Sequence, residues 1–310
     1  MSAARVRTKV FPGPQNLALF AAEAKGFFER RSVEADIQIT VGSDEQRTAL
    51  AEGTVELIHS AVDNAVYMVE AAGQDIVIVS GGGNGMNDLV VRPEIRSYED
   101  LRGKTVVVDA AMTAYAFQLY TLLAMHGLAR GDYGILPRGG ATQRLQAMRE
   151  SKQHAAAMLN PPWNFVAEQD GFRSFGPAVK VIGRYQADGA FVRRAWAAEH
   201  ADTLVRYLQA AIEGIRWAYD PRNRSAAVAI LARRLRIDPA LTARSVEAAV
   251  GPDGGLAPDA AFDLPGFENM LKIRDAVAGT WGGKIPAPEK YLDLTYYARA
   301  LAGLPRRETR

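Results

Sequence analysis

Cysteine is absent from this 310-residue sequence. Its absence excludes disulfides, thiolate nucleophiles and metal sites built on cysteine sulfur. The four histidines lack the spacing of metal ligands, so we predict neither a metal site nor a cofactor. They are His59, His126, His154 and His200. No apolar run reaches the roughly 18–20 residues that a membrane-spanning helix needs, so membrane insertion is not expected.

An excess of charge of either sign is missing too. The sequence has 37 Lys and Arg against 35 Asp and Glu, which gives a net charge of +2. No basic cluster interleaves with aromatic residues, which argues against nucleic acid as a partner. Hydrophobic residues make up 48% of the chain, as in soluble globular proteins. The length exceeds the roughly 250–300 residues at which single cores stop growing, and this predicts two lobes.

A secretory signal is also not visible. The opening segment MSAARVRTKVFPG has neither the apolar stretch nor the cleavage site of such a signal. Two locations stay open: the cytoplasm, or the periplasm if a signal has been removed.

Short strands alternate with helical patterns in the first 90 residues, an order typical of a parallel sheet with helices on both faces. Ser43 and Gln46 fit a capping box at the start of one of these helices. The segment SGGGNGMND, residues 80–88, lacks the spacing of a phosphate-binding loop and is interpreted as a mobile turn. Strands are expected at 5–10, 33–41, 55–61 and 75–81.

The pattern then restarts and continues to residue 187. Helical periodicity dominates from residue 193 onward, with Pro and Gly between the helices. Strands of the second region are expected at 87–93, 104–110, 133–139, 154–162 and 179–185.

Three segments resemble the signatures of a known family. They are LALFAAEAKGFFERRSVEADIQIT, TALAEGTVELIHSAVDNAV and VVRPEIRSYEDLRGKTVVVDAAMTAYAFQLYTLLAMHGL. The sequence is similar to solute-binding proteins of ABC transporters for sulfonates, taurine and thiamine precursors, over residues 6–300. The most specific element is S-x-x-D-L-x-G-K within the third segment.

The resemblance implies the periplasmic-binding-protein type 2 fold. Two Rossmann-like α/β lobes would be joined by two crossover strands, with a ligand cleft between them. Lobe one would comprise residues 1–90 and 188–310, with the helical C-terminal part packed on it, and lobe two residues 91–187. The same fold carries enzymes, namely aromatic-acid decarboxylases, a biphenyl-sulfinate desulfinase and thiamine pyrimidine synthases, so fold alone does not decide function.

Ligands of open parallel sheets lie beyond the carboxyl ends of the strands. After the first strand come Phe11, Gln15 and Asn16, whose amides offer donors and acceptors. Asn16 can instead serve only as a helix cap. After the third strand come Ser60, Asp63 and Asn64, which we expect at the edge of the pocket.

His59 stands beside this group and leaves three alternatives open. It can pair with Asp63 as a general base, fill a structural position, or lie near the ligand without chemistry. The desulfinases carry a cysteine nucleophile in the first loop, and this sequence has none there.

The second region adds further candidates for ligand contacts. Thr113 begins a long helix, where it can cap the helix or help to hold an anion. Trp163 can cover an aromatic ligand or belong to the core. The full set of candidates here is Asn87, Thr113, Tyr115, Asn160, Trp163 and Tyr185.

Arginine is scarce in these strand-end loops, where only Arg138 and Arg184 occur. We therefore expect a small aromatic or heterocyclic ligand that is neutral or carries a single negative charge. The leading hypothesis is a monomeric solute-binding component of an ABC importer that closes around its ligand and docks on a permease. The alternative is a cytosolic enzyme, a decarboxylase, a C–S or C–N bond-cleaving enzyme or a pyrimidine synthase, with His59 and Asp63 as acid and base.

Overall fold

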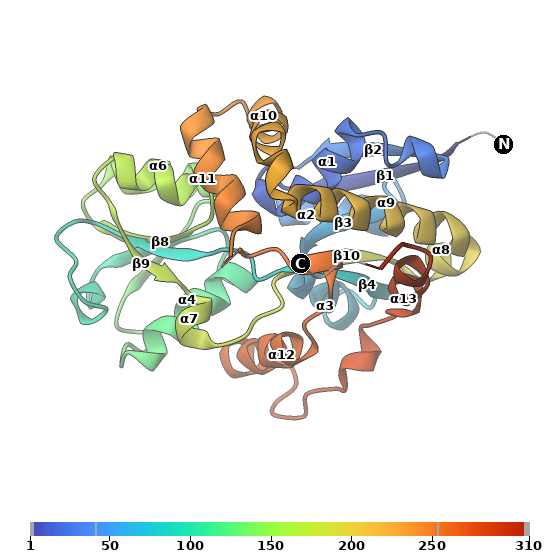
Figure 1. Ribbon diagram of the computed structural model, residues 1–310. Coiled ribbons are helices and arrows are strands. Elements are labelled where there is room, and N and C mark those ends of the chain that lie inside the picture. The colour runs from blue at the N-terminus through green and yellow to red at the C-terminus, as the bar shows by residue number, and fades with distance from the viewer. Residues whose placement is uncertain (1–2, 41, 253, 307–310) are drawn as a thin grey trace. The chain divides into compact units, whose positions relative to one another are not determined.

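The computed structural model describes residues 3–40, 42–252 and 254–306, and the chain divides into two compact units. The first unit contains the chain up to Gly83, then Asp188–Phe262, then the chain from Pro288. The second unit contains Asn84–Ala187 and Asp263–Ala287. Each unit has a mixed five-stranded sheet covered by helices, which confirms the predicted fold class (Figure 1).

The sheet of the first unit has the strand order β2-β1-β3-β10-β4. Strands β1, β2 and β3 are parallel, and β10 runs antiparallel to β3 and β4. Alternating burial explains β1. Val6, Thr8 and Val10 are fully buried on one face, and Arg7 and Lys9 between them are partly exposed. The strands are β1 (Ala4–Val10), β2 (Val33–Ile39), β3 (Leu57–Ala61), β4 (Ile76–Gly83) and β10 (Asp188–Arg193).

Helices α1 and α9 of the first unit pack closely against each other. Gly214 lies in α9 where the carbonyl of Ala18 in α1 approaches, and a Cβ at Gly214 would overlap that oxygen. The helices of this unit are α1 (Leu17–Ala24), α2 (Ser43–Glu52), α3 (Val62–Glu70), α8 (Arg194–Glu199), α9 (Ala201–Tyr219), α10 (Arg224–Leu235), α11 (Pro239–Val250) and α13 (Thr295–Ala302).

The sheet of the second unit has the order β7-β6-β8-β5-β9, with β5 antiparallel to both of its neighbours. Its strands are β5 (Asp88–Val91), β6 (Thr105–Val108), β7 (Gly134–Pro137), β8 (His154–Leu159) and β9 (Arg173–Pro177). Its helices are α4 (Ala114–Met125), α5 (Ala141–Glu150), α6 (Trp163–Gln169), α7 (Val179–Ile182) and α12 (Leu264–Ala278).

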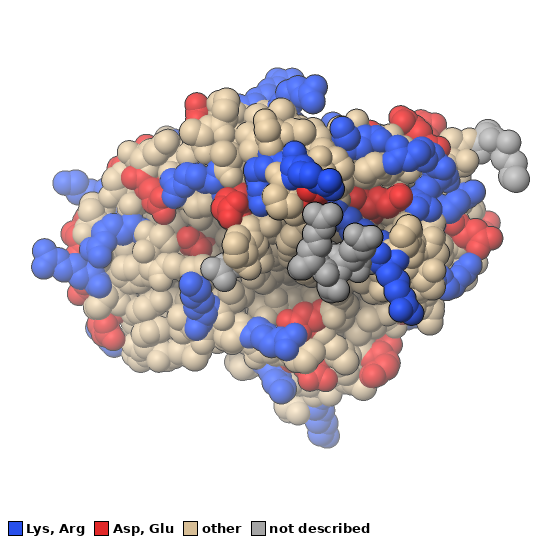
Figure 2. All heavy atoms as spheres, viewed as in Figure 1, with Lys and Arg blue, Asp and Glu red and all other residues tan. Residues whose placement is uncertain are grey.

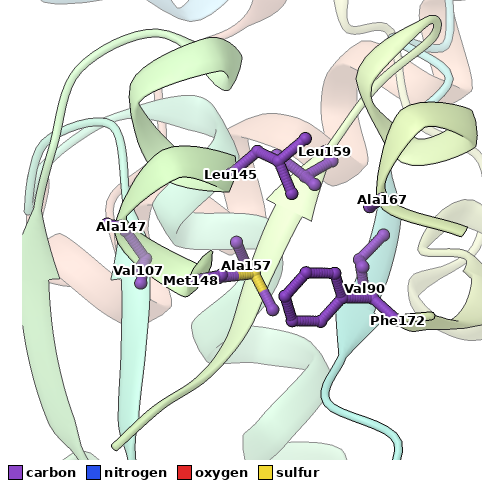
Figure 3. Close-up of a cluster of buried hydrophobic side chains, with 9 residues drawn as sticks. All are labelled: Val90, Val107, Leu145, Ala147, Met148, Ala157, Leu159, Ala167 and Phe172. Carbon is purple, nitrogen blue, oxygen red and sulfur yellow. The ribbon is translucent and has the colours of Figure 1, made fainter. Parts of the chain in front are cut away.

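A cluster of buried side chains holds α5 and α6 against this second sheet (Figure 3). Leu145 of α5 lies near Leu159 of β8, Met148 of α5 lies near Ala157 of β8, and Phe172 lies beside Val90 of β5. Burial of such side chains contributes about 1.5–3 kcal/mol each. Trp163 packs against this cluster as a partly buried neighbour.

Helix α12 departs from the expected division of the chain. Residues 263–287 group with the second unit, whereas the sequence assigned all of 188–310 to lobe one. The reason is visible in its contacts. The amide of Asn269 donates to the carbonyls of Ile182 and Arg184, at 3.0 and 2.8 Å, and Asp263 pairs with the Arg184 guanidinium at 2.6 Å.

Three local predictions are wrong. Residues 179–182 form a helix instead of a strand, because a short apolar run fits either period. Gly81–Gly83 continue β4 instead of forming a turn. The capping box fails because Ser43 is the first residue of α2, after the N-cap Gly42.

Basic and acidic side chains are interspersed over the face in Figure 2.

Candidate functional site

A pocket with about 40 Å³ of free space lies in the first unit. Its polar side begins at the loop after β1 and continues along β3 and β4, and its apolar side is α9. The lining residues are Gln15, Asn16, Ala18, Leu19, His59, Ser80, Gly81, Gly82, Leu208, Ala211, Ile212, Ile215, Leu256, Ala257, Ala260 and Tyr297. Three of them, Gln15, Asn16 and His59, are residues that the sequence singled out.

The loop after β1 is held by its own hydrogen bonds. The side-chain amide of Asn16 donates to the carbonyl of Phe11 at 2.8 Å, and the Asn16 backbone N–H donates to the carbonyl of Gly13 at 3.3 Å. The Asn16 side chain is therefore used to close the loop and does not cap α1. The Gln15 side chain folds back over Gly13, where a Cβ would overlap its amide.

The Gln15 amide oxygen is buried, and none of the described residues donates a hydrogen bond to it. A buried acceptor without a donor costs about 1–3 kcal/mol relative to a satisfied one. Gln15 lines the pocket, while its amide oxygen lies against Gly13.

His59 lies on the side of the sheet that faces α9. It pairs across the sheet with Val10 of β1 and Ala190 of β10, and Ala190 in turn pairs with Ser80 of β4. Laterally paired residues point to the same face, so His59 and Ser80 both reach the pocket. The ring centroid of Tyr207 in α9 lies 5.9 Å from that of His59.

Burial lowers the pKa of His59 to about 3, and burial is the whole cause of the shift. The imidazole is therefore neutral at physiological pH. Its Nε2 atom is buried and has no hydrogen-bond partner among the described residues. Tyr207 behind it is fixed by the Thr8 hydroxyl, which donates to the phenol oxygen at 3.1 Å.

Glycines at the end of β4 allow a second backbone to lie against the strand. A Cβ on Gly81 would overlap the carbonyl of Ala261, and the N–H of Ala257 donates to the carbonyl of Gly82 at 2.8 Å. This contact places Ala257 and Ala260 in the pocket wall. The Ser80 hydroxyl donates to the carbonyl of Gly81 at 3.2 Å.

The pocket has one polar wall and carries no formal charge. None of the lining residues within the described part of the chain is Asp, Glu, Lys or Arg. Burial raises the pKa of Tyr297, so its phenol is also neutral at physiological pH. The nearby charges of Arg216 and Asp259 compensate each other, with Nε and Oδ1 at 2.8 Å.

The other candidates after β3 lie outside the pocket lining. Ser60 points away from His59 because side chains alternate along β3. A Cβ on Gly189, the partner of Ser60, would meet the Val62 side chain at 2.7 Å, so α3 with Asp63 begins on the Ser60 face. Ser60 and Asp63 are buried. The Asn64 amide oxygen accepts a hydrogen bond of 2.6 Å from Arg47.

The first three candidates of the second unit have identifiable local contacts. The buried Asn87 amide donates to the Gln118 amide oxygen at 3.3 Å. Thr113 is the N-cap of α4: its hydroxyl accepts from the Ala116 N–H at 3.3 Å and donates to Asp109 at 2.6 Å. Tyr115 lies under a guanidinium, as described next.

Arg144 of α5 is a buried cation that sequence reasoning missed. Its Nε donates to the carbonyl of Met158 at 3.0 Å and its Nη1 to that of Gly139 at 2.8 Å. Its guanidinium lies 5.8 Å from the Tyr115 ring centroid. Burial lowers its pKa, and the nearby Asp109 opposes that shift.

The last three candidates of the second unit follow β8 or precede β10. The carbonyl of Asn160 accepts from the Trp163 N–H at 2.9 Å, and Asn160 and Tyr185 are buried. Trp163 packs against the core cluster of the second unit as a partly buried neighbour. A role for these residues in ligand binding stays a prediction.

Within residues 3–40, 42–252 and 254–306, no group of three or more His, Asp or Glu side chains is placed to hold a metal ion. No helix in the same ranges combines the length and apolar character that crossing a bilayer requires.

Comparison with protein families matches residues 13–224 to the family described as NMT1/THI5 like. That range is more than half of the 310 residues. Comparison with curated protein sequences gives no match.

Many solved structures share the fold. The alkanesulfonate-binding protein SsuA from Xanthomonas axonopodis pv. citri, bound to MOPS, is 18% identical with a TM-score of 0.71, covering 93% of this chain and 96% of its own. The nitrate-binding protein NrtA from Synechocystis PCC 6803 is 11% identical with a TM-score of 0.79, covering 97% and 89%.

A serine mutant of the desulfurization enzyme DSZB, in complex with biphenyl-2-sulfinic acid, is 14% identical with a TM-score of 0.70, covering 97% and 99%. At these identities the likeness establishes the fold. Binding proteins and an enzyme share it, so the residues of the pocket have to decide between the two.

Proposed function

The chain belongs to the NMT1/THI5-like family, and we propose that it is the solute-binding component of an ABC importer. Its ligand is a small organic molecule that enters the pocket of the first unit. The proposal rests on one observation: this pocket at the ends of β1 and β4 sets the polar residues Gln15, Asn16, His59 and Ser80 opposite apolar residues of α9.

This lining supports binding because small-molecule sites combine apolar walls with a few placed polar groups. The apolar residues of α9 on the opposite wall, such as Leu208 and Ile212, add contact area for the rest of the ligand.

The same residues argue against catalysis at this pocket. A general base works best with a pKa near the operating pH, and the pKa of His59 is lowered to about 3. A serine nucleophile would need its hydroxyl bonded to the imidazole, but Ser80 donates to the carbonyl of Gly81. The first loop has no cysteine, since the chain contains none.

The solved relatives of this fold support the remaining parts of the proposal. SsuA and NrtA are named as binding proteins for alkanesulfonate and nitrate. For this chain we propose a monomer that works in the periplasm and delivers its ligand to a permease. The aromatic or heterocyclic character of the ligand stays the expectation drawn from the sequence.

Incubation of the purified protein with a metabolite library, followed by calorimetry and mass spectrometry of the recovered ligand, tests this function. We expect 1:1 binding and an unchanged ligand after many hours. Conversion of the ligand by the wild type, lost in His59→Ala, would replace the proposal with the enzymatic alternative. The absence of any ligand across sulfonates, carboxylates, amides and heterocycles would also overturn it.

A further inference from the structure

We propose that residues 255–261, which we call the strap, form a gate over the pocket of the first unit and open to let a ligand enter. The strap follows α11 and ends two residues before the chain passes into the second unit at Asp263. The purpose of the gate rests on the proposed solute-binding function. Its movement is a property of the first unit that can be measured without a ligand.

The strap is a thin wall of the pocket. Leu256, Ala257 and Ala260 line the pocket, whereas Pro258 and Ala261 of the same segment are exposed to solvent. One layer of chain therefore separates the pocket from water on this side. The other walls belong to β3, β4 and α9, which are held by the ladders of the sheet and by the close packing of α9 on α1.

Two successive residues of the strap have a backbone conformation that residues other than glycine rarely adopt. Asp259 has a φ of 57° and Ala260 a φ of 56°. The left-handed conformation brings Cβ close to the following carbonyl oxygen, which is unfavourable for an alanine. Such residues persist only where surrounding contacts hold them. The closed strap therefore depends on contacts made by its neighbours.

Two side chains of α9 supply those contacts. The Arg216 guanidinium donates to both carboxylate oxygens of Asp259, at 2.8 and 3.1 Å, and the Tyr219 hydroxyl donates to the carbonyl of Leu256 at 2.5 Å. Arg216 also donates to the carbonyl of Pro305 at 2.6 Å, which fixes its own position. Because side chains make these bonds, they can break and form again without the loss of a helix or a strand.

The strap lies against the glycine run 81–83 at the end of β4. A Cβ on Gly81 would overlap the carbonyl of Ala261, and the Ala257 N–H donates to the carbonyl of Gly82 at 2.8 Å. The glycines let the closed strap approach the strand closely. Since they carry no side chains, this part of β4 does not interlock with the strap, which can lift away and return.

Opening of the strap should expose His59 to a reagent in solution. His59 lines the pocket, and its imidazole is neutral at physiological pH. Diethyl pyrocarbonate acylates the lone-pair nitrogen of a neutral imidazole. This reagent is much larger than the roughly three water-sized positions that about 40 Å³ provides. The rate at which His59 is labelled therefore measures how often the pocket is open.

Two ion pairs of α9 provide a matched comparison. Arg216→Gln breaks the 2.8 Å pair with Asp259 of the strap. Arg31→Gln breaks a pair of the same length with Glu213, and neither of these residues lines the pocket. We expect Arg216→Gln to raise the labelling rate of His59 roughly tenfold or more. Arg31→Gln should change it by less than about twofold.

Hydrogen exchange at the Ala257 amide measures the strap itself, because that N–H is bonded to the carbonyl of Gly82. Exchange should also become roughly tenfold faster in Arg216→Gln and stay within about twofold of the wild type in Arg31→Gln. Circular dichroism checks that each variant folds. If Arg216→Gln does not fold, Tyr219→Phe replaces it. That change removes only the hydroxyl on Leu256 and should raise both rates by about fivefold.

Peptide mapping by mass spectrometry reads the labelling of each histidine separately. Faster labelling of His59 and faster exchange at Ala257, in the strap variant alone, would support the gate. Equal effects in Arg31→Gln, a change in only one of the two readouts, or no change in either would overturn it. Labelling of wild-type His59 as fast as that of the exposed His200 would also overturn it. Because no ligand is used, failure of the library experiment would remove the proposed function and leave this result standing.

Discussion

The side-chain amide of Asn16 donates a 2.8 Å hydrogen bond to the backbone carbonyl of Phe11. This bond joins the two ends of the loop that carries Gln15 into the pocket. Asn16 itself is buried, with 3% of its surface exposed. The loop is therefore held in place before any ligand arrives, and preorganisation of this kind favours affinity.

Asn16→Ala should weaken ligand binding by about tenfold, because the loop loses the bond that positions Gln15. Asn223→Ala is a matched control. Its amide donates to the carbonyl of Trp217 at 2.9 Å, and neither residue lines the pocket. Both variants should lose about 1 kcal/mol of unfolding free energy, but only Asn16→Ala should lose affinity in calorimetry. Equal affinity in the two variants would contradict the role of the loop.

Gly214→Ala should destabilise the first unit by about 1–3 kcal/mol, as overpacking does. The added Cβ would overlap the carbonyl of Ala18 and force α9 away from α1. Because α9 forms the apolar wall, affinity should fall as well. Gly131→Ala serves as the control, since a Cβ there meets nothing within 4 Å. Urea denaturation of both variants measures the difference, and a Gly214→Ala variant as stable as the control would refute the packing argument.

The burial of His59 should lower the free energy of unfolding at acidic pH. The folded pKa is about 3 and the unfolded value 6.5, so the unfolded state gains its proton first as the pH falls. Stability is therefore lost between pH 6.5 and about 3, and each unit of separation is worth about 1.4 kcal/mol. His59→Gln removes this loss. Unfolding free energies of both proteins across this range should diverge as the pH falls; parallel curves would mean that the imidazole is solvated.

The burial of Asp188, the first residue of β10, should lower the free energy of unfolding as the pH rises, not as it falls. Burial raises its pKa from 3.8 to about 7, so the folded protein keeps the proton longer than the unfolded chain does. Its contribution is present below pH 3.8 and is lost as the pH rises to about 7. Asp188→Asn should therefore gain stability over the wild type across this window and hold the gain above pH 7. A gain confined to acidic pH would have the wrong sign.

Trp163 separates two alternatives that the sequence left open. Its ring packs beside the core cluster of the second unit, so Trp163→Ala should lower the stability of that unit by roughly 2–3 kcal/mol. Intrinsic fluorescence and urea unfolding measure this loss. Unchanged stability together with weaker binding would instead support the alternative that Trp163 covers an aromatic ligand.

Much of the fold could be predicted because it depends on local patterns. Alternating and continuous apolar runs located β1, β3 and β4, and Gly53 ends α2 with a φ of 74°, a conformation that glycine adopts readily. The run at 179–182 failed because four residues cannot distinguish a strand from a helical turn.

The pocket was only half visible in the sequence. Gln15, Asn16 and His59 could be found because they follow or end strands. The apolar wall could not, because Leu208 and Ile215 come from a helix that lies about 150 to 200 residues further along the chain than His59 and Gln15. Two glycines in the sequence could have indicated where other segments pack. Gly81 in a strand and Gly214 in a helix both lie where another backbone approaches closely.

The Nε2 nitrogen of His59 provides the most direct test of the central claim, that a small ligand occupies the pocket of the first unit. Its resonance, assigned by comparison with His59→Gln in ¹⁵N NMR of labelled imidazoles, reports both protonation and hydrogen bonding. On saturation with the ligand that the library identifies, we predict a shift at Nε2 while the ring stays neutral at pH 7. A tightly bound ligand that leaves the His59 resonances unchanged would contradict the account.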